Sequence, residues 1–98
     1  MGIRNFKGQA TAEIAAGLDN KRTRTLLPRE LHKAALKKVQ ILRAAKQLDD
    51  LRCFPGLRLE KLKGLRREEY SIRINNQFRL CFKWESGAAF DVGIEDYH

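Results

Sequence analysis

The sequence has few of the residues and segments that mark several large protein classes. It contains two cysteines, two prolines and one tryptophan in 98 residues. No apolar run approaches the ~18 residues that a membrane-spanning helix needs. Residues 1–6 also lack the apolar stretch of a signal peptide. We therefore expect no membrane association and a cytoplasmic location.

The two cysteines, Cys53 and Cys81, are too few and too far apart in the sequence for a zinc site. Without a secretion signal, a structural disulfide is not expected either. We interpret both as unreactive thiols in or near the core. The sequence thus predicts a protein without a metal or other cofactor.

What the sequence has in excess is positive charge. Twenty Lys and Arg residues stand against twelve Asp and Glu, which gives a net charge of +8 and a pI near 9.9. A compact domain this basic attracts polyanions such as RNA, DNA or anionic membranes. Its 43% hydrophobic and 33% charged residues are ordinary for a globular protein. With no repeat or Pro/Gly-rich linker, residues 1–98 are expected to form one domain.

The first half of the chain carries mainly helical signals. We predict a short first strand at residues 3–6, a helix at 7–16 with Gly17 as its C-cap, and a polar basic loop at 19–25. Pro28 suits the first turn of a longer helix, which helical apolar spacing extends to about Asp50. Residues 53–56 then predict a turn.

After Gly56 the apolar period changes from helical spacing to two, which indicates strands. Alternating segments occur at residues 57–60, 70–74, 78–84 and 90–94, with turn-like joints at 75–77 and 85–87. The predicted fold is α+β, with two N-terminal helices on one face of a mainly antiparallel sheet of four to five strands. Phe78, Leu80, Phe82 and Trp84 would face the core, each burial contributing roughly 2 kcal/mol.

The opposite sheet face is the candidate functional surface, because it gathers basic side chains. Eight cations lie between Leu57 and Lys83, namely Arg58, Lys61, Lys63, Arg66, Arg67, Arg73, Arg79 and Lys83. After Lys83 there is no Lys or Arg, whereas four acidic residues follow, namely Glu85, Asp91, Glu95 and Asp96. The pattern fits a phosphate-binding surface, since guanidinium groups bind two phosphate oxygens at once, but also a solvated strand face. Lysines of the long helix have a weaker claim to contact nucleic acid.

The last four residues, Glu95 to His98, combine groups suited to acid–base chemistry. A histidine transfers protons at neutral pH, a tyrosine stacks on a base or binds a phosphate, and an aspartate orients the histidine. By position alone, such residues are usually a frayed tail. A regular strand would point Tyr97 to the same side as Glu95, and Asp96 and His98 to the other side.

Three segments of the sequence together resemble the HigB toxins of type II toxin–antitoxin systems. They are LEKLKG at residues 59–64, YSIRINNQFRLCF at 70–82 and EDYH at 95–98. The resemblance implies a microbial RelE-like fold that cleaves messenger RNA in the ribosomal A site by metal-independent attack of a 2′-hydroxyl. It also implies a HigA-type helix-turn-helix antitoxin, and operator DNA bound only through the toxin–antitoxin complex.

The resemblance assigns roles to individual residues. Asp96, Tyr97 and His98 match the catalytic group at the family's C-terminus, and Arg79 matches an arginine that stabilises the transition state. Lys63 matches a basic residue near the active site. The basic residues predicted to bind RNA phosphates are Lys63, Arg58, Arg66, Arg73 and Lys83.

One departure from the family pattern concerns position 60. Better-known members carry a histidine in the strand before the Leu-Lys-Gly run, whereas this sequence has Glu60. Glu60 could accept the 2′-hydroxyl proton while His98 protonates the leaving 5′-oxygen. It could equally be a structural partner of Lys61 or Arg58.

Two other functions are compatible with the same fold, because the fold alone does not decide function. One is a ParE-like poison of DNA gyrase, which needs no terminal acid–base group. The other is a non-catalytic module that binds RNA or a partner protein. The EDYH ending speaks against the gyrase poison, whereas the non-catalytic module would bind RNA without cutting it.

Overall fold

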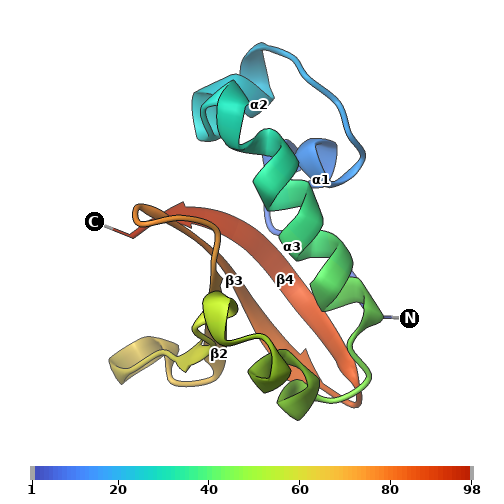
Figure 1. Ribbon diagram of the computed structural model, residues 1–98, viewed down its shortest axis with the longest axis vertical. Coiled ribbons are helices and arrows are strands. Elements are labelled where there is room, and N and C mark those ends of the chain that lie inside the picture. Colours follow the sequence, from blue (N-terminus) through green and yellow to red (C-terminus); the bar gives the residue numbers. More distant parts are fainter. Residues whose placement is uncertain (1, 98) are drawn as a thin grey trace.

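The computed structural model describes residues 2–97 and confirms the α+β class. Three α-helices precede four strands: α1 (Gln9–Ala15), α2 (Lys21–Leu26), α3 (His32–Ala44), β1 (Glu60–Lys61), β2 (Glu69–Arg73), β3 (Phe78–Glu85) and β4 (Ala88–Asp96). Short 3-10 helices fill the connections: η1 (Arg29–Leu31), η2 (Leu48–Cys53), η3 (Pro55–Leu57) and η4 (Gly64–Arg66). Figure 1 shows the α-helices gathered on one side of the sheet.

The sheet is an antiparallel meander in the order β1-β2-β3-β4. Residues 3–6, predicted as a strand, make only two isolated parallel bridges to β4, Ile3 with Ala89 and Phe6 with Val92. The strand predicted from Leu57 begins instead at Glu60. Leu57 belongs to η3, and Arg58 then takes a left-handed conformation with φ 48°.

Helix α1 ends as the sequence predicts. Gly17, at φ 81°, donates its N–H to the carbonyl of Ile14, and Leu18 donates to that of Glu13. This pair of hydrogen bonds satisfies carbonyls that have no partner at the end of the helix. The bonds require a left-handed residue, and glycine adopts that conformation without strain. In the described residues 2–97, no helix combines the length and apolar character needed to cross a bilayer.

Residues 19–25 were predicted as a loop, and that prediction is wrong for most of the segment. Lys21–Leu26 form α2, which begins at Asn20 with a capping box. The Asn20 side chain accepts the Thr23 N–H at 2.9 Å, and the Thr23 hydroxyl accepts the Asn20 N–H at 2.9 Å. These bonds satisfy free N–H groups of the first turn, so a short polar run becomes helical.

The long helix was predicted to run from Pro28 to about Asp50, but α3 covers only His32–Ala44. The first turn after Pro28 is η1. At the other end, the Asp50 carboxylate accepts N–H bonds from Lys46 and Gln47 at 2.8 and 3.1 Å. The chain therefore leaves α3 after Ala44 and starts the capped 3-10 helix η2, although the apolar spacing continues through Ala45 and Leu48.

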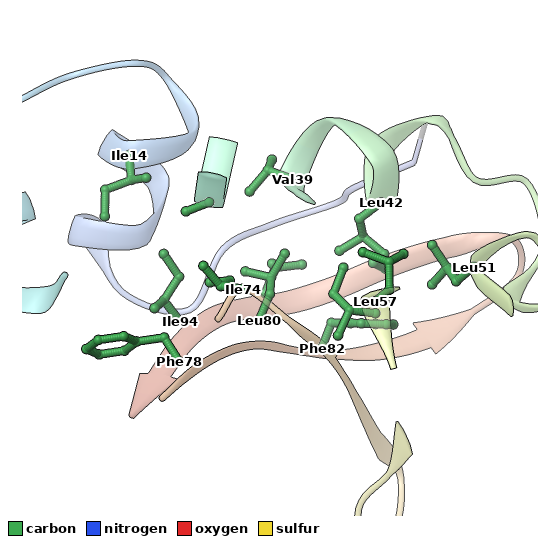
Figure 2. Packing of buried hydrophobic residues seen from close by; sticks show 14 of the residues in the cluster. Ile14, Val39, Leu42, Leu51, Leu57, Ile74, Phe78, Leu80, Phe82 and Ile94 are labelled. Atoms are coloured by element: carbon green, nitrogen blue, oxygen red, sulfur yellow. The ribbon is translucent and has the colours of Figure 1, made fainter. Parts of the chain in front are cut away.

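The core lies between the helices and one face of the sheet. Figure 2 shows Val39 and Leu42 of α3 above Leu80 and Phe82 of β3, with Ile14 of α1 at the other end. Phe78, Leu80 and Phe82 are buried as predicted. Trp84 was predicted to be a core residue, but it is only partly buried, because β3 extends beyond the start of β2 at this point.

A β-bulge near Asp91 changes the facing of β4. Cys81 pairs with Gly93 but Lys83 with Phe90, so β4 has one extra residue. Asp91 has φ 52° and is held by Asn5, whose amide oxygen accepts the Asp91 N–H at 2.9 Å. Phe90 was predicted to share a face with Val92 and Ile94; the bulge places it instead beside Lys83, on the face away from the helices.

We refer to the sheet side away from the helices as the open face. Its side chains come from four strands, and they are Glu60, Glu69, Ser71, Arg73, Arg79, Cys81, Lys83, Phe90 and Glu95.

Both cysteines were predicted to lie in or near the core. The prediction is correct for Cys81, which is buried, and wrong for Cys53, which is exposed at the end of η2.

Candidate anion site on the open face

Arg79, near the start of β3, is held by neutral acceptors. Its Nε donates to Ser71 Oγ at 2.7 Å, and its Nη2 donates to the carbonyl oxygens of Arg58 at 2.6 Å and Ser71 at 3.2 Å. The residue is 7% exposed. Its Nη2 also lies 3.9 Å from Glu60 Oε1, a long contact to a side chain that is 55% exposed. The guanidinium is therefore fixed in direction while most of its charge is left uncompensated.

A hollow of about 350 Å³ opens beside this guanidinium. We call it the Arg79 pocket, and it is lined by Arg58, Glu60, Arg73, Asn75, Asn76, Arg79 and Tyr97. Arg73 and Arg79 are direct cross-strand partners, and like charges in that arrangement destabilise a sheet. An anion in the pocket would relieve this repulsion. The lining thus suits a phosphate group.

Tyr97 is the C-terminal wall of the pocket. Its N–H donates to the carbonyl of Gln77 at 2.6 Å, and its ring centroid lies 5.4 Å from the Arg79 guanidinium carbon. This distance is within the range of a cation–π contact. The ring is 43% exposed, so its remaining surface is available for stacking.

Asp96 points to the opposite side from Tyr97, as a regular strand requires. It is the cross-strand partner of Phe78, and its Oδ2 accepts a bond from Gln77 Nε2 at 3.0 Å. The bulge lies before Glu95, so it does not alter the facing of the last residues. His98, the predicted proton donor, lies outside the described residues.

Glu60 lies in the Arg79 pocket because β1 pairs it with Ser71. Among the ion pairs of residues 2–97, its partner is Arg79, and neither Lys61 nor Arg58. Arg58 lines the pocket, and its carbonyl accepts a bond from Arg79. Its left-handed backbone is a conformation that non-glycine residues rarely adopt, and here the Arg79 bond holds it.

Arg66 occupies the centre of the open face and is bound very differently. Its Nη2 lies 2.8 Å from Glu69 Oε1 and 2.5 Å from Glu95 Oε2. The hydrogen bonds from Arg66 lower the pKa of Glu69, and the two carboxylates raise the pKa of Arg66. Arg66 was predicted to bind RNA phosphates; that role stays a prediction, and its contacts favour a structural one.

The remaining predicted phosphate ligands lie apart from the Arg79 pocket. Lys63 is exposed just before η4, and Lys83 lies at the other end of β3.

Sequence reasoning did not identify Ser71, which orients Arg79. Its signal was its place two residues before Arg73 on the same strand, which puts both on the open face. Within residues 2–97, no group of three His, Cys, Asp or Glu side chains is arranged to hold a metal ion.

The fold and the pocket define a class of basic α+β domains with an arginine-lined pocket on one sheet face, which is a candidate anion site. Residues 15–98 match the family described as the HigB-like toxin, a RelE-like toxin of the type II toxin–antitoxin system HigB. Toxin HigB-1 of Vibrio cholerae serotype O1 is 40% identical over 79 residues, which are 81% of this chain and 82% of that protein. An uncharacterized protein of Haemophilus influenzae is 36% identical over 75 residues, 76% of this chain and 74% of its own length.

The chain belongs to the HigB-like family of RelE-like toxins. Membership in a toxin–antitoxin family implies an antitoxin as its partner.

Proposed function

We propose that this toxin is a ribosome-dependent endoribonuclease that cuts messenger RNA at the Arg79 pocket. The observation that carries the proposal is the way Arg79 is held. Neutral acceptors fix its guanidinium, so its charge remains available for a phosphate. Family membership supports the same reaction, since RelE-like toxins are in general endoribonucleases.

The chemistry is transesterification within the RNA. The 2′-hydroxyl oxygen attacks the adjacent phosphorus, the bond to the 5′-oxygen breaks, and a 2′,3′-cyclic phosphate remains. Negative charge builds on the phosphorane, and a fixed guanidinium stabilises it without reorganising. Arg79 has this role, and Arg58 and Arg73 hold the flanking phosphate oxygens. Tyr97 stacks on a neighbouring base.

Two protons must move in this reaction. Glu60, on the pocket wall, accepts the proton of the 2′-hydroxyl, and its exposed carboxylate can approach the sugar. His98 protonates the leaving 5′-oxygen, and Asp96 favours the charged form of that histidine. No metal ion takes part, so a chelator leaves cleavage intact.

The proposed setting includes three partners. The ribosome presents the messenger RNA, and the net charge of +8 favours this association. A HigA-type helix-turn-helix antitoxin neutralises the toxin. Operator DNA is bound only through the complex of the two proteins.

Induction of the protein in cells, followed by mapping of transcript 5′ ends, tests the proposal. We expect cuts within codons that disappear when translation is blocked. His98→Ala and Arg79→Ala should abolish both cuts and growth arrest while the proteins stay folded by circular dichroism. Full toxicity of both variants would rule out this site, and DNA damage without cuts would indicate a gyrase poison instead.

A further inference from the structure

A second hollow, of about 500 Å³, lies at the end of the sheet away from the Arg79 pocket, beside Lys83 and Phe90 of the open face. Its volume is in the range of small-ligand sites. It forms because β3 extends beyond the start of β2: Glu69 pairs with Lys83, and Trp84 and Glu85 pair only with β4. We call it the aromatic hollow.

The aromatic hollow combines rings with cations. Phe90 comes from the open face, whereas Tyr70 and Trp84 stand at core-facing strand positions and pack partly against the core. All three rings line the hollow and are partly solvent-accessible. Lys61, Arg67 and Lys83 supply three positive charges. Rings beside cations are the combination by which proteins bind single-stranded nucleic acid, with bases stacked on the rings and phosphates near the cations.

Lys83 lies over one of the rings. Its Nζ lies 6.0 Å from the Phe90 ring centroid and 3.8 Å from Asp91 Oδ2. The ion pair is long, and both side chains are about 40% exposed. Such a pair neutralises little charge, so Lys83 can bind a phosphate.

Two carboxylates, Glu68 and Glu85, also line the hollow. They leave it with one net positive charge, which is too little for a site that binds phosphate alone. Carboxylates accept hydrogen bonds from the amino groups of bases. Rings, cations and carboxylates together therefore suit a whole nucleotide whose base carries an amino group.

We propose that the aromatic hollow binds an unpaired nucleotide of the RNA that flanks the cleaved bond. The inference rests on the proposed function, because it extends the RNA path from the Arg79 pocket. Arg79 and Lys83 are four residues apart on β3, a rise of roughly 13 Å, so the flanking strand passes over Arg66 between them. The second site holds the RNA in register while the first cuts it.

The single tryptophan of the chain, Trp84, makes a direct test possible. The probe is a short oligoadenylate whose 2′-hydroxyls are methylated, so that it cannot be cut by 2′-attack. We expect it to quench Trp84 fluorescence, while inorganic tripolyphosphate, which has charge but no base, does not. Equal quenching by tripolyphosphate, or binding of labelled RNA that leaves Trp84 fluorescence unchanged, would overturn the proposal.

Matched variants separate stacking and local charge from general attraction. Phe90→Leu removes a ring while keeping an apolar side chain, and Lys83→Gln removes one charge in the hollow. Each should weaken binding by about tenfold, as expected for loss of one base contact. Lys37→Gln removes the same charge from α3 and should change affinity less than about twofold. Equal losses in Lys83→Gln and Lys37→Gln, with none in Phe90→Leu, would contradict the site.

Arg79→Ala distinguishes failure of this inference from failure of the proposed function. This variant should lose transcript cleavage and keep Trp84 quenching. If the wild type cleaves transcripts but Phe90→Leu and Lys83→Gln bind RNA as tightly as the wild type, the aromatic hollow is not a nucleotide site and the proposed endoribonuclease function is retained. If RNA quenches Trp84 fluorescence but the wild type cleaves no transcript, the endoribonuclease proposal is wrong and the hollow is still an RNA-binding site.

Discussion

Arg79 and Arg66 lie on the same sheet face, but their partners give them different capacities. Arg79 donates to a hydroxyl and two backbone carbonyls, whereas Arg66 donates to two carboxylates. Carbonyl and hydroxyl partners fix a guanidinium and leave its charge, while carboxylates fix it and cancel the charge. The first arrangement suits binding of an added anion, and the second suits joining of strands.

Replacing each arginine with lysine tests this difference between Arg79 and Arg66, and it is expected to give the largest effect. Arg79→Lys keeps the charge but loses the planar fork that Ser71 and Arg58 orient. We expect cleavage to fall by on the order of 100-fold, the scale of removing one transition-state donor. Arg66→Lys should change cleavage less than about fivefold. Transcript cleavage by purified ribosomes and toxin measures both, and equal losses would remove the distinction.

A smaller effect is expected from the residue that orients Arg79. Ser71→Ala removes the acceptor of the Arg79 Nε bond, so the guanidinium loses one of its fixed directions. Cleavage should fall by about tenfold, or about 1.4 kcal/mol of transition-state stabilisation. Its readout is the maximal rate, with substrate affinity little changed.

The positioning role has its own control. If Ser71 acts through Arg79, Ser71→Ala should cost little further activity once Arg79 is already lysine. Additive losses in the double variant would instead indicate that Ser71 affects the fold. Thermal unfolding of the single variant checks this independently.

Arg66 is expected to matter for stability. Arg66→Ala leaves Glu69 and Glu95 without their shared cation. The free energy of unfolding should fall by only about 1 kcal/mol, because these side chains are partly exposed.

Cys81 reports on the same change, because it lies buried nearby and burial raises the pKa of its thiol to about 11. A thiol reagent should label Cys53 in the wild type, and Cys81 in addition in Arg66→Ala.

Arg52→Ala is the matched control for that prediction. Arg52 pairs with Asp49 at 3.0 Å, but both side chains are more than 60% exposed. Denaturant unfolding should show no change beyond about 0.5 kcal/mol, and Cys81 should remain unlabelled. A loss as large as that of Arg66→Ala would mean that arginine removal destabilises this basic fold generally.

The smallest effect is a pH dependence at the Arg66 bridge. Because the Arg66 hydrogen bonds lower the folded-state pKa of Glu69, its contribution is present above the unfolded value of about 4.3. It is lost as the pH falls through the lower folded value. Wild type should therefore lose stability below about pH 4.3 more steeply than Glu69→Gln, by at most about 1 kcal/mol. Parallel curves of the two proteins in acid unfolding would contradict this.

The bounds of the two central strands, β2 and β3, could be predicted from the sequence better than the helix boundaries. Strands β2 and β3 start or end within about one residue of the predicted bounds, because alternation of apolar and polar residues is itself the burial pattern of a half-covered sheet. Helix α2 has one buried residue, Thr23, so apolar spacing could not indicate it. The C-terminal end of α3 depends on a side chain, Asp50, that caps backbone groups.

The site was predictable in part for the same reason. Period-two alternation places Arg73 and Arg79 on one face, and regular continuation of β4 places Tyr97 with them. Only the structure shows that Arg66 is neutralised by two carboxylates, because this depends on a loop whose path has no periodic signal. Phe90 faces Lys83 through a bulge, which alternation alone does not reveal.

The bulge has a consequence for how the protein folds. Asp91 is pinned by Asn5, and Ile3 and Phe6 bridge to the same strand, across more than 80 residues of intervening sequence. Contacts between such distant residues form slowly, because the chain must close a long loop first. We therefore expect docking of residues 3–6 on β4 to be one of the later steps of folding. Asn5→Ala would remove both side-chain bonds that hold Asp91 in the bulge, and should thereby loosen the strand at the neighbouring Phe90.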